Sequence, residues 1–282
     1  MRRSPVATAL RPVVWLGLVG LLAIYLFPLY WLVNTSLKPR AELFGSTPTL
    51  VAQQPTIEPY LSVLFDRGFI GLLRNSFVVC ALTVLLTLAI SLAITYPLTR
   101  LPMSRTLRVR VLNWALSLRF LPPIAVVVPY FVVVRTLGLY NSPLALVLVY
   151  TLSNLPFGIW MLKGFLSEVP LELEEAAYVD GATRLVAFRR ILLPLIAPGL
   201  LASSVIIFAF CWSEFLFALI LTSTRDAQTF PVGVQGLVTQ FEIIWNEMAA
   251  AGVIAIAIPL VLMFLARRYV LAGLTFGVIR EK

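Results

Sequence analysis

The sequence lacks the residues on which most soluble enzymes depend. It contains no histidine, the usual metal ligand and the usual proton relay near neutral pH. Its two cysteines, Cys80 and Cys211, both lie inside apolar runs, so no disulfide framework is indicated. None of the fifteen glycines is followed by lysine, so the phosphate-binding loop of ATPases is absent. No nucleophile elbow or metal-ligand spacing stands out either. We therefore expect no catalytic residue, no metal site, no cofactor bound by this chain and no ATP hydrolysis by the chain itself.

Charge is also scarce, and apolar residues are abundant. Of the 282 residues 60% are hydrophobic and 12% are charged, and the mean hydropathy is +0.95, which is typical of a membrane protein rather than a water-soluble one. The net charge of +9 does not indicate nucleic-acid binding. The basic residues fall in short loops beside apolar runs, where membrane orientation explains them.

Six apolar runs are long enough to cross a bilayer as helices. The sequence therefore predicts an all-α, polytopic membrane protein whose transmembrane domain covers residues 12–268, between a basic arm (1–11) and a short tail (269–282). Prolines 122, 123 and 129 interrupt the third run. The predicted spans cover residues 13–33, 72–98, 111–134, 143–165, 199–223 and 249–266.

The distribution of lysine and arginine predicts the orientation. Segments 1–11, 99–110, 163–190 and 267–282 hold 15 of these residues, whereas the three loops on the other side hold five. Because basic loops stay in the cytoplasm, we expect both termini and the loop at 168–198 on the cytoplasmic side.

The loop at 168–198 is the one long mid-chain segment that is both charged and patterned as a helix. Pro170 suits a first helical turn, and three glutamates follow where the helix dipole favours carboxylates. Gly181 predicts a stop, and Thr183 predicts the cap of a second helix over 184–191. Pro194 and Pro198 are expected to bound that second helix.

This loop also contains a motif. Glu175-Ala176-Ala177, Gly181 and Ile191-x-Leu193-Pro194 stand at the spacing of the EAA loop, and the segment resembles that loop of ABC-importer permeases. In that family the loop docks on an ATPase subunit. The resemblance implies coupling residues in this loop and one in the tail: Glu175, Ala176, Ala177, Asp180, Gly181, Ile191, Leu193, Pro194 and Gly277.

Further stretches are similar to carbohydrate-importer permeases of the maltose type. They include Leu155-Pro156-Phe157, Trp212-x-Glu214-Phe215 and Gly273-Leu274-Thr275. The chain departs from the family at Ser213, where asparagine is frequent. The resemblance implies a type I ABC-importer permease fold, with six spans, in the cytoplasmic membrane.

The same resemblance implies a function and an assembly. The chain would be a permease subunit that imports a carbohydrate, such as an oligosaccharide, a disaccharide or a polyol. Its partners would be a second homologous permease, two ATPase subunits that bind ATP, and an extracytoplasmic solute-binding protein. An ion-coupled secondary transporter and a membrane-embedded enzyme are the alternatives. The first would need buried titratable groups, and Glu214 is the only carboxylate within a predicted span.

Five residues are candidates for the substrate path. Ionisable residues within spans are expensive and often functional, which singles out Arg119 and Glu214. Asn154, Trp212 and Ser213 add hydrogen-bonding and stacking groups. The alternative is a structural interpretation of these residues. Arg119 and Glu214 would then form a buried ion pair, or Arg119 would extend to the inner headgroups, and Asn154 would form a hydrogen bond between helices.

Overall fold

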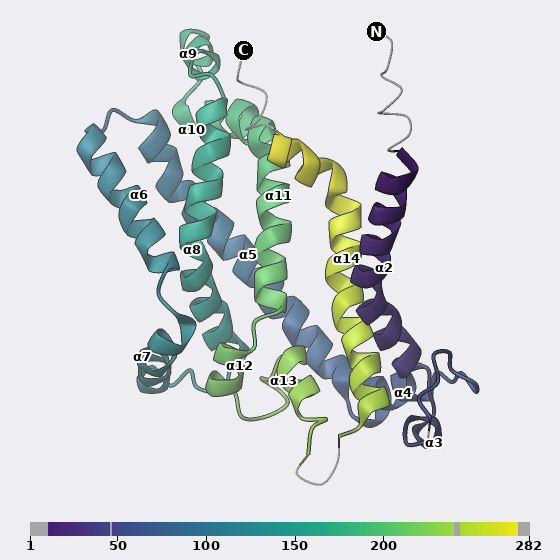
Figure 1. Ribbon diagram of the computed structural model, residues 1–282. Helices are drawn as coiled ribbons and strands as arrows, with labels where there is room; N and C mark the ends of the chain where they lie inside the picture. The colour runs from purple at the N-terminus through teal and green to yellow at the C-terminus, as the bar shows by residue number, and fades with distance from the viewer. Residues whose placement is uncertain (1–10, 46, 240–242, 276–282) are drawn as a thin grey trace. The chain divides into compact units, whose positions relative to one another are not determined.

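The computed structural model describes residues 11–45, 47–239 and 243–275, and helices form most of this part of the chain (Figure 1). An isolated β-bridge joins Val238 to Ile243. The helices are α2 (Arg11–Ser36), α3 (Arg40–Leu43), α4 (Glu58–Leu61), α5 (Phe69–Arg100), α6 (Arg105–Arg119), α7 (Pro123–Thr136), α8 (Pro143–Glu168), α9 (Glu172–Val179), α10 (Arg184–Ala187), α11 (Leu193–Trp212), α12 (Leu216–Leu221), α13 (Phe230–Gln235) and α14 (Trp245–Thr275), with π-helical turns at Ser62–Asp66 and Phe188–Leu192.

Five helical segments of the described residues are long and apolar enough to cross a membrane. A sixth arises if α6 and α7, which meet at an angle of 96°, count as one broken span. The predicted all-α class with about six spans is confirmed. The five segments are Val14–Ser36, Phe69–Arg100, Pro143–Glu168, Arg184–Trp212 and Trp245–Arg268.

The third predicted span, 111–134, is not one helix. It begins earlier, at Arg105, and it stops at Arg119, before a second helix starts at Pro123. The break has a local cause, because Pro123 has no N–H to donate to the Arg119 carbonyl. Pro122 in turn takes an extended conformation, with ψ of 131°. The chain therefore turns sharply just after the arginine.

The helix that contains most of the fifth predicted span, 199–223, both begins and ends earlier in the chain than those bounds. The helix that begins at Arg184 runs on to Trp212, so Pro194 and Pro198 do not end it. A π-helical turn at Phe188–Leu192 lies just ahead of Pro194 and changes the backbone pairing there, which accommodates the missing N–H. The helix stops instead at Ser213, and the short α12 follows after the break.

By contacts, the chain divides into two compact units, and the first contains residues up to Phe69 and Gly236–Ile256. Its loop between α2 and α4 is held by buried polar groups. The ammonium of Lys38 donates to the Thr49 carbonyl at 2.5 Å and lies 5.2 Å from the centre of the Trp31 ring. The carboxylate of Glu42 accepts from the Thr49 hydroxyl at 2.5 Å and from the Gln53 backbone N–H at 3.1 Å. Apart from the short α3, side-chain hydrogen bonds rather than regular secondary structure connect the described residues of this loop.

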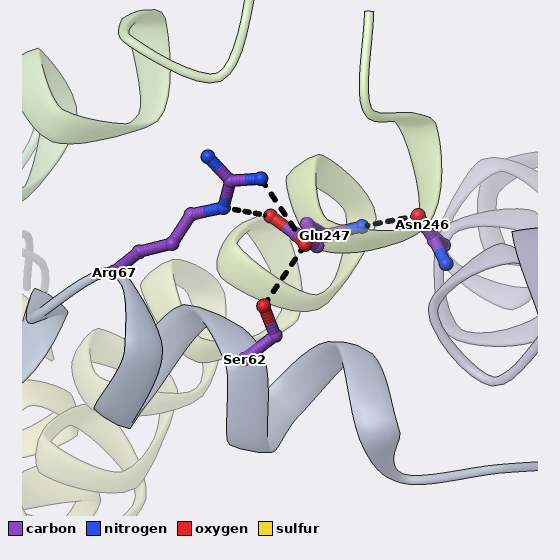
Figure 2. Close-up of polar contacts among 4 residues, drawn as sticks. All are labelled: Ser62, Arg67, Asn246 and Glu247. Atoms are coloured by element: carbon purple, nitrogen blue, oxygen red, sulfur yellow. Dashed lines mark hydrogen bonds and ion pairs between the residues drawn. The ribbon is translucent and has the colours of Figure 1, made fainter.

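Glu247, in the first turn of α14, anchors the other end of this unit (Figure 2). Its carboxylate forms an ion pair with Arg67 and accepts from the Ser62 hydroxyl at 2.9 Å. The side chain of Asn246 accepts from the Glu247 backbone N–H at 3.0 Å within the same turn. These bonds fix the π-helical turn Ser62–Asp66 against α14 within the unit.

The second unit contains Ile70–Gln235 and the chain from Ala257 onward. Within it, α8 packs against α6, α11 and α12, and α9 and α10 lie at one end of α8 and α11 (Figure 1). Tyr150, 1% exposed, is one of the largest fully buried side chains of its core. At position 158 of α8 a Cβ would come within 2.4 Å of the Ser91 hydroxyl oxygen, so glycine permits α5 and α8 to touch there.

Candidate coupling segment and substrate-path residues

The turn between α9 and α10 depends on Gly181. Its φ of +83° lies in the left-handed region, which glycine enters at little cost. The Gly181 N–H donates to the Tyr178 carbonyl at 3.1 Å, and the Ala182 N–H donates to the Ala177 carbonyl at 2.9 Å. These two bonds form a Schellman motif that ends α9. The predicted glycine stop is confirmed.

The helix after Gly181 starts at the predicted cap and continues beyond its predicted end. The Thr183 hydroxyl accepts from the Val186 N–H at 3.4 Å and caps α10. The motif residues Ile191, Leu193 and Pro194 lie on the continuous helix Arg184–Trp212, not on a separate element. One helix therefore joins the coupling segment to the fifth span.

A buried ion pair fixes α9 to the end of α5. Glu174 is buried, and its carboxylate lies 2.6 Å from Nε of Arg100. The same guanidinium donates to the Val169 carbonyl at 2.8 Å. Sequence reasoning missed this pair because the two residues are far apart in the chain and because Glu174 resembles its exposed neighbours. The helical period was the usable signal, since Glu174 and the buried Ala177 are three residues apart.

The rest of α9 and its turn is exposed. Glu175, Ala176, Asp180 and Gly181 all face outward. Val179 is 87% exposed, and Leu171, Leu173 and Tyr178 are also largely uncovered. Exposed apolar side chains on one short segment, with carboxylates among them, are typical of a docking site for another protein. Gly277, the tail residue predicted to take part in coupling, lies outside the described residues.

Arg119 ends α6 at the break before α7, with an exposed side chain. Its guanidinium carbon lies 4.9 Å from the centre of the Phe210 ring and 5.9 Å from that of Phe157. Within the described part of the chain no ion pair joins Arg119 to Glu214. The interpretation of these two residues as a structural pair is therefore wrong.

Glu214 stabilises the start of α12. Its carboxylate accepts from the Phe217 N–H at 2.9 Å and from the Ala218 N–H at 3.3 Å. These donors belong to the first turn of α12, where a carboxylate also compensates the helix dipole. Glu214 is partly buried. A capping role accounts for its charge.

The other three path candidates divide between the core and the surface. Trp212 is 4% exposed and lies nearly parallel to the rings of Phe208 and Phe230, so it packs in the core of the second unit. Asn154 is buried, and its amide donates to the Tyr150 carbonyl at 2.9 Å and contacts the Cys211 sulfur. Ser213 is exposed, and its hydroxyl donates to the Ala209 carbonyl at 2.8 Å.

A match to a known protein family covers both the EAA-like segment and the candidate substrate-path residues. Residues 86–275 match the family of binding-protein-dependent transport system inner membrane components. The chain belongs to this family. Membership in this permease family places the protein in the inner membrane as part of a binding-protein-dependent transport system, and it confirms the resemblance inferred from the EAA-like motif.

Relatives in the permease family match over nearly the whole chain. The sulfoquinovosyl glycerol transport system permease protein SmoH of Agrobacterium fabrum is 35% identical, with 95% of this chain and 93% of SmoH covered. The trehalose/maltose transport system permease protein MalG of Thermococcus litoralis is also 35% identical, with coverage of 94% and 95%. In a crystal structure of a bacterial ABC transporter that imports alginate, one chain superposes with a TM-score of 0.78 at 18% identity, covering 95% of this chain and 98% of that one. This superposition confirms the ABC-importer permease fold.

Proposed function

We propose that this chain is a permease subunit that imports a carbohydrate, driven by ATP hydrolysis on separate ATPase subunits. The names of SmoH, of MalG and of the 34% identical diacetylchitobiose permease DasC of Streptomyces coelicolor all specify saccharide transport. Three different glycosides among proteins of similar identity support the substrate class and leave the individual sugar open.

The observation that carries the proposal is the construction of the EAA-like segment. Its exposed surface on α9 is backed by the Glu174–Arg100 ion pair and ends in the Gly181 turn. From there the chain continues as one helix to Trp212. A docking surface that is rigidly joined to a span is what transmission of an ATPase movement requires.

The charge distribution supports an orientation with the coupling segment in the cytoplasm. In the second unit, the end that holds α9 and α10 also contains Arg100, Arg105, Arg184, Arg189 and Arg190. The opposite end, with α7 and α12, contains Arg74, Arg135 and Arg225. Basic residues concentrate on the cytoplasmic side of membrane proteins, so both chain termini are placed there in our proposal.

The proposed assembly contains a second homologous permease, two ATPase subunits with their ATP, and an extracytoplasmic solute-binding protein. Two sequence features support the assignment of ATP hydrolysis to separate subunits: the phosphate-binding loop is missing from this chain, and the EAA-like motif is present. No cofactor is assigned to this chain itself.

Reconstitution tests the proposal. The chain is co-purified with the ATPase, the second permease and the binding protein from the same organism, and the complex is placed in liposomes loaded with ATP. We expect uptake of radiolabelled saccharide that stops with orthovanadate and that is lost when the ATPase is omitted. Uptake that follows an imposed ion gradient without ATP would contradict the proposal and favour the secondary-transporter alternative.

A further inference from the structure

Arg119 carries a positive charge at a depth where charges are costly. It follows fourteen helical residues of α6 and precedes the Pro122-Pro123 break, so it lies well inside the candidate broken span. A cation at that depth requires water or an anionic partner. None of the carboxylates in the described part of the chain lies within ion-pair distance of it. Glu214 is the carboxylate that the sequence suggested as its partner, and that carboxylate accepts hydrogen bonds from the backbone of α12.

The two phenylalanines hold the guanidinium without neutralising it. Contact with the Phe210 and Phe157 rings fixes the position of the planar group, since aromatic faces attract cations. The N–H groups lie in the plane of the guanidinium, so stacking leaves them able to donate. The result is a positioned and charged donor group that lacks a counter-ion.

This group borders a cavity. A space of about 300 Å³ lies between α6, α7, α8 and α12, with Arg119, Trp114, Tyr130, Ser153 and Phe217 among its lining residues. That volume is at the lower end of small-molecule sites. Trp114 and Tyr130 offer faces for stacking on a sugar ring, and the Ser153 hydroxyl is a polar group on the wall. Arg119 is the only charged residue among the described residues that line the cavity.

We propose that Arg119 and this cavity form a subsite for the anionic substituent of an acidic saccharide, a carboxylate, sulfonate or phosphate on the transported sugar. The planar guanidinium pairs with two oxygens of such a group at once. The anion supplies the negative charge that no described carboxylate of this chain provides to Arg119, whereas a neutral sugar leaves the arginine without an ionic partner. The inference rests on the proposed carbohydrate import and narrows its substrate class.

The test compares saccharides in matched pairs that differ only by an acidic group, such as glucose with glucuronic acid and cellobiose with cellobiouronic acid. Uptake is measured in the reconstituted complex for wild type, Arg119→Gln and Arg119→Lys. The matched control is Arg135→Gln, because Arg135 contacts the Phe131 ring in the same way but does not line the cavity. We expect uptake of the acidic members, with kcat/KM reduced roughly 10- to 100-fold in Arg119→Gln, partly retained in Arg119→Lys and unchanged in Arg135→Gln.

The remaining outcomes separate this inference from the proposed function. The subsite is overturned if only the neutral saccharides are taken up with ATP, or if Arg119→Gln does not change the uptake of the acidic saccharides. Either result is still consistent with carbohydrate import. A third outcome concerns assembly: Arg119→Gln fails to assemble with the second permease, whereas Arg119→Lys assembles and transports neutral sugars normally. This result would place the counter-ion of Arg119 on the second permease, and it also overturns the subsite. ATP-dependent uptake of no saccharide at all contradicts the proposed function itself.

Discussion

The Glu174–Arg100 ion pair permits a quantitative prediction about the coupling segment. Glu174→Gln removes one charge of a pair whose side chains are 1% and 7% exposed, and so it leaves Arg100 buried without its partner. Breaking a buried pair on one side typically costs about 3–5 kcal/mol. We expect about 3 kcal/mol here, because Arg100 keeps its bond to the Val169 carbonyl.

Hydrogen exchange at the amides of α9 measures this cost locally. A loss of about 3 kcal/mol corresponds to exchange on the order of 100-fold faster at 176–180, if opening of α9 controls the rate. The matched control is Glu172→Gln, the same chemical change at an exposed position of the same helix. Replacing both partners with apolar residues, in Arg100→Met with Glu174→Leu, should restore much of the protection.

The result that would refute this reasoning is equal exchange in Glu174→Gln and Glu172→Gln. Such equality would mean that α9 is held by its apolar contacts, such as that of Ala177, and that the ion pair contributes nothing measurable to its docking.

Three further predictions concern single residues. Gly181→Val should cost about 1–2 kcal/mol, because its φ of +83° crowds a Cβ, and it should weaken ATPase binding in pull-down assays. Gly181→Asn, which tolerates this conformation, should bind nearly normally, and wild-type binding by Gly181→Val would exclude the turn as a coupling element. Gly199→Ala should lower the melting temperature, because its Cβ would lie 2.3 Å from the Phe165 ring, whereas Gly164→Ala, with open space around it, should not. The Thr49 hydroxyl lowers the pKa of Glu42 from its ordinary 4.5, so the loop stability that Glu42 adds should be complete above about pH 4.5 and disappear as the pH falls through the lowered value. Proteolysis of the loop against pH measures this loss, and the same profile in Glu42→Gln would rule it out.

Local chemistry made part of the fold predictable. Gly181 and Thr183 act through their own backbone neighbourhood, so the turn and the cap followed from the sequence. The Pro122-Pro123 pair indicated an interruption but not its 96° angle, which depends on how α7 packs against α12. The helix stop at Ser213 had no local signal, since neither glycine nor proline stands there.

The helix end predicted at Pro194 is wrong, and the burial of Trp212 was not foreseen from the sequence. A proline usually ends a helix, but the π-helical turn ahead of Pro194 allows the helix to continue. Trp212 was predicted to line the path because aromatic side chains stack on sugars. Phe208 lies one helical turn before Trp212 on α11, but the other ring of the stack, Phe230, comes from α13, and sequence spacing alone does not reveal that contact.

The uninterrupted helix from Arg184 to Trp212 has a mechanical consequence. Its 29 residues extend roughly 43 Å, so it spans the distance from the docking surface to the far end of the span without a hinge. If the end at Arg184 acts as the pivot, a tilt of about 10° displaces the end at Trp212 by roughly 7 Å, close to the width of a sugar ring. A small stroke of the ATPase would then be amplified by leverage alone, and the π-helical turn at Phe188–Leu192 would be the most compliant point of the lever.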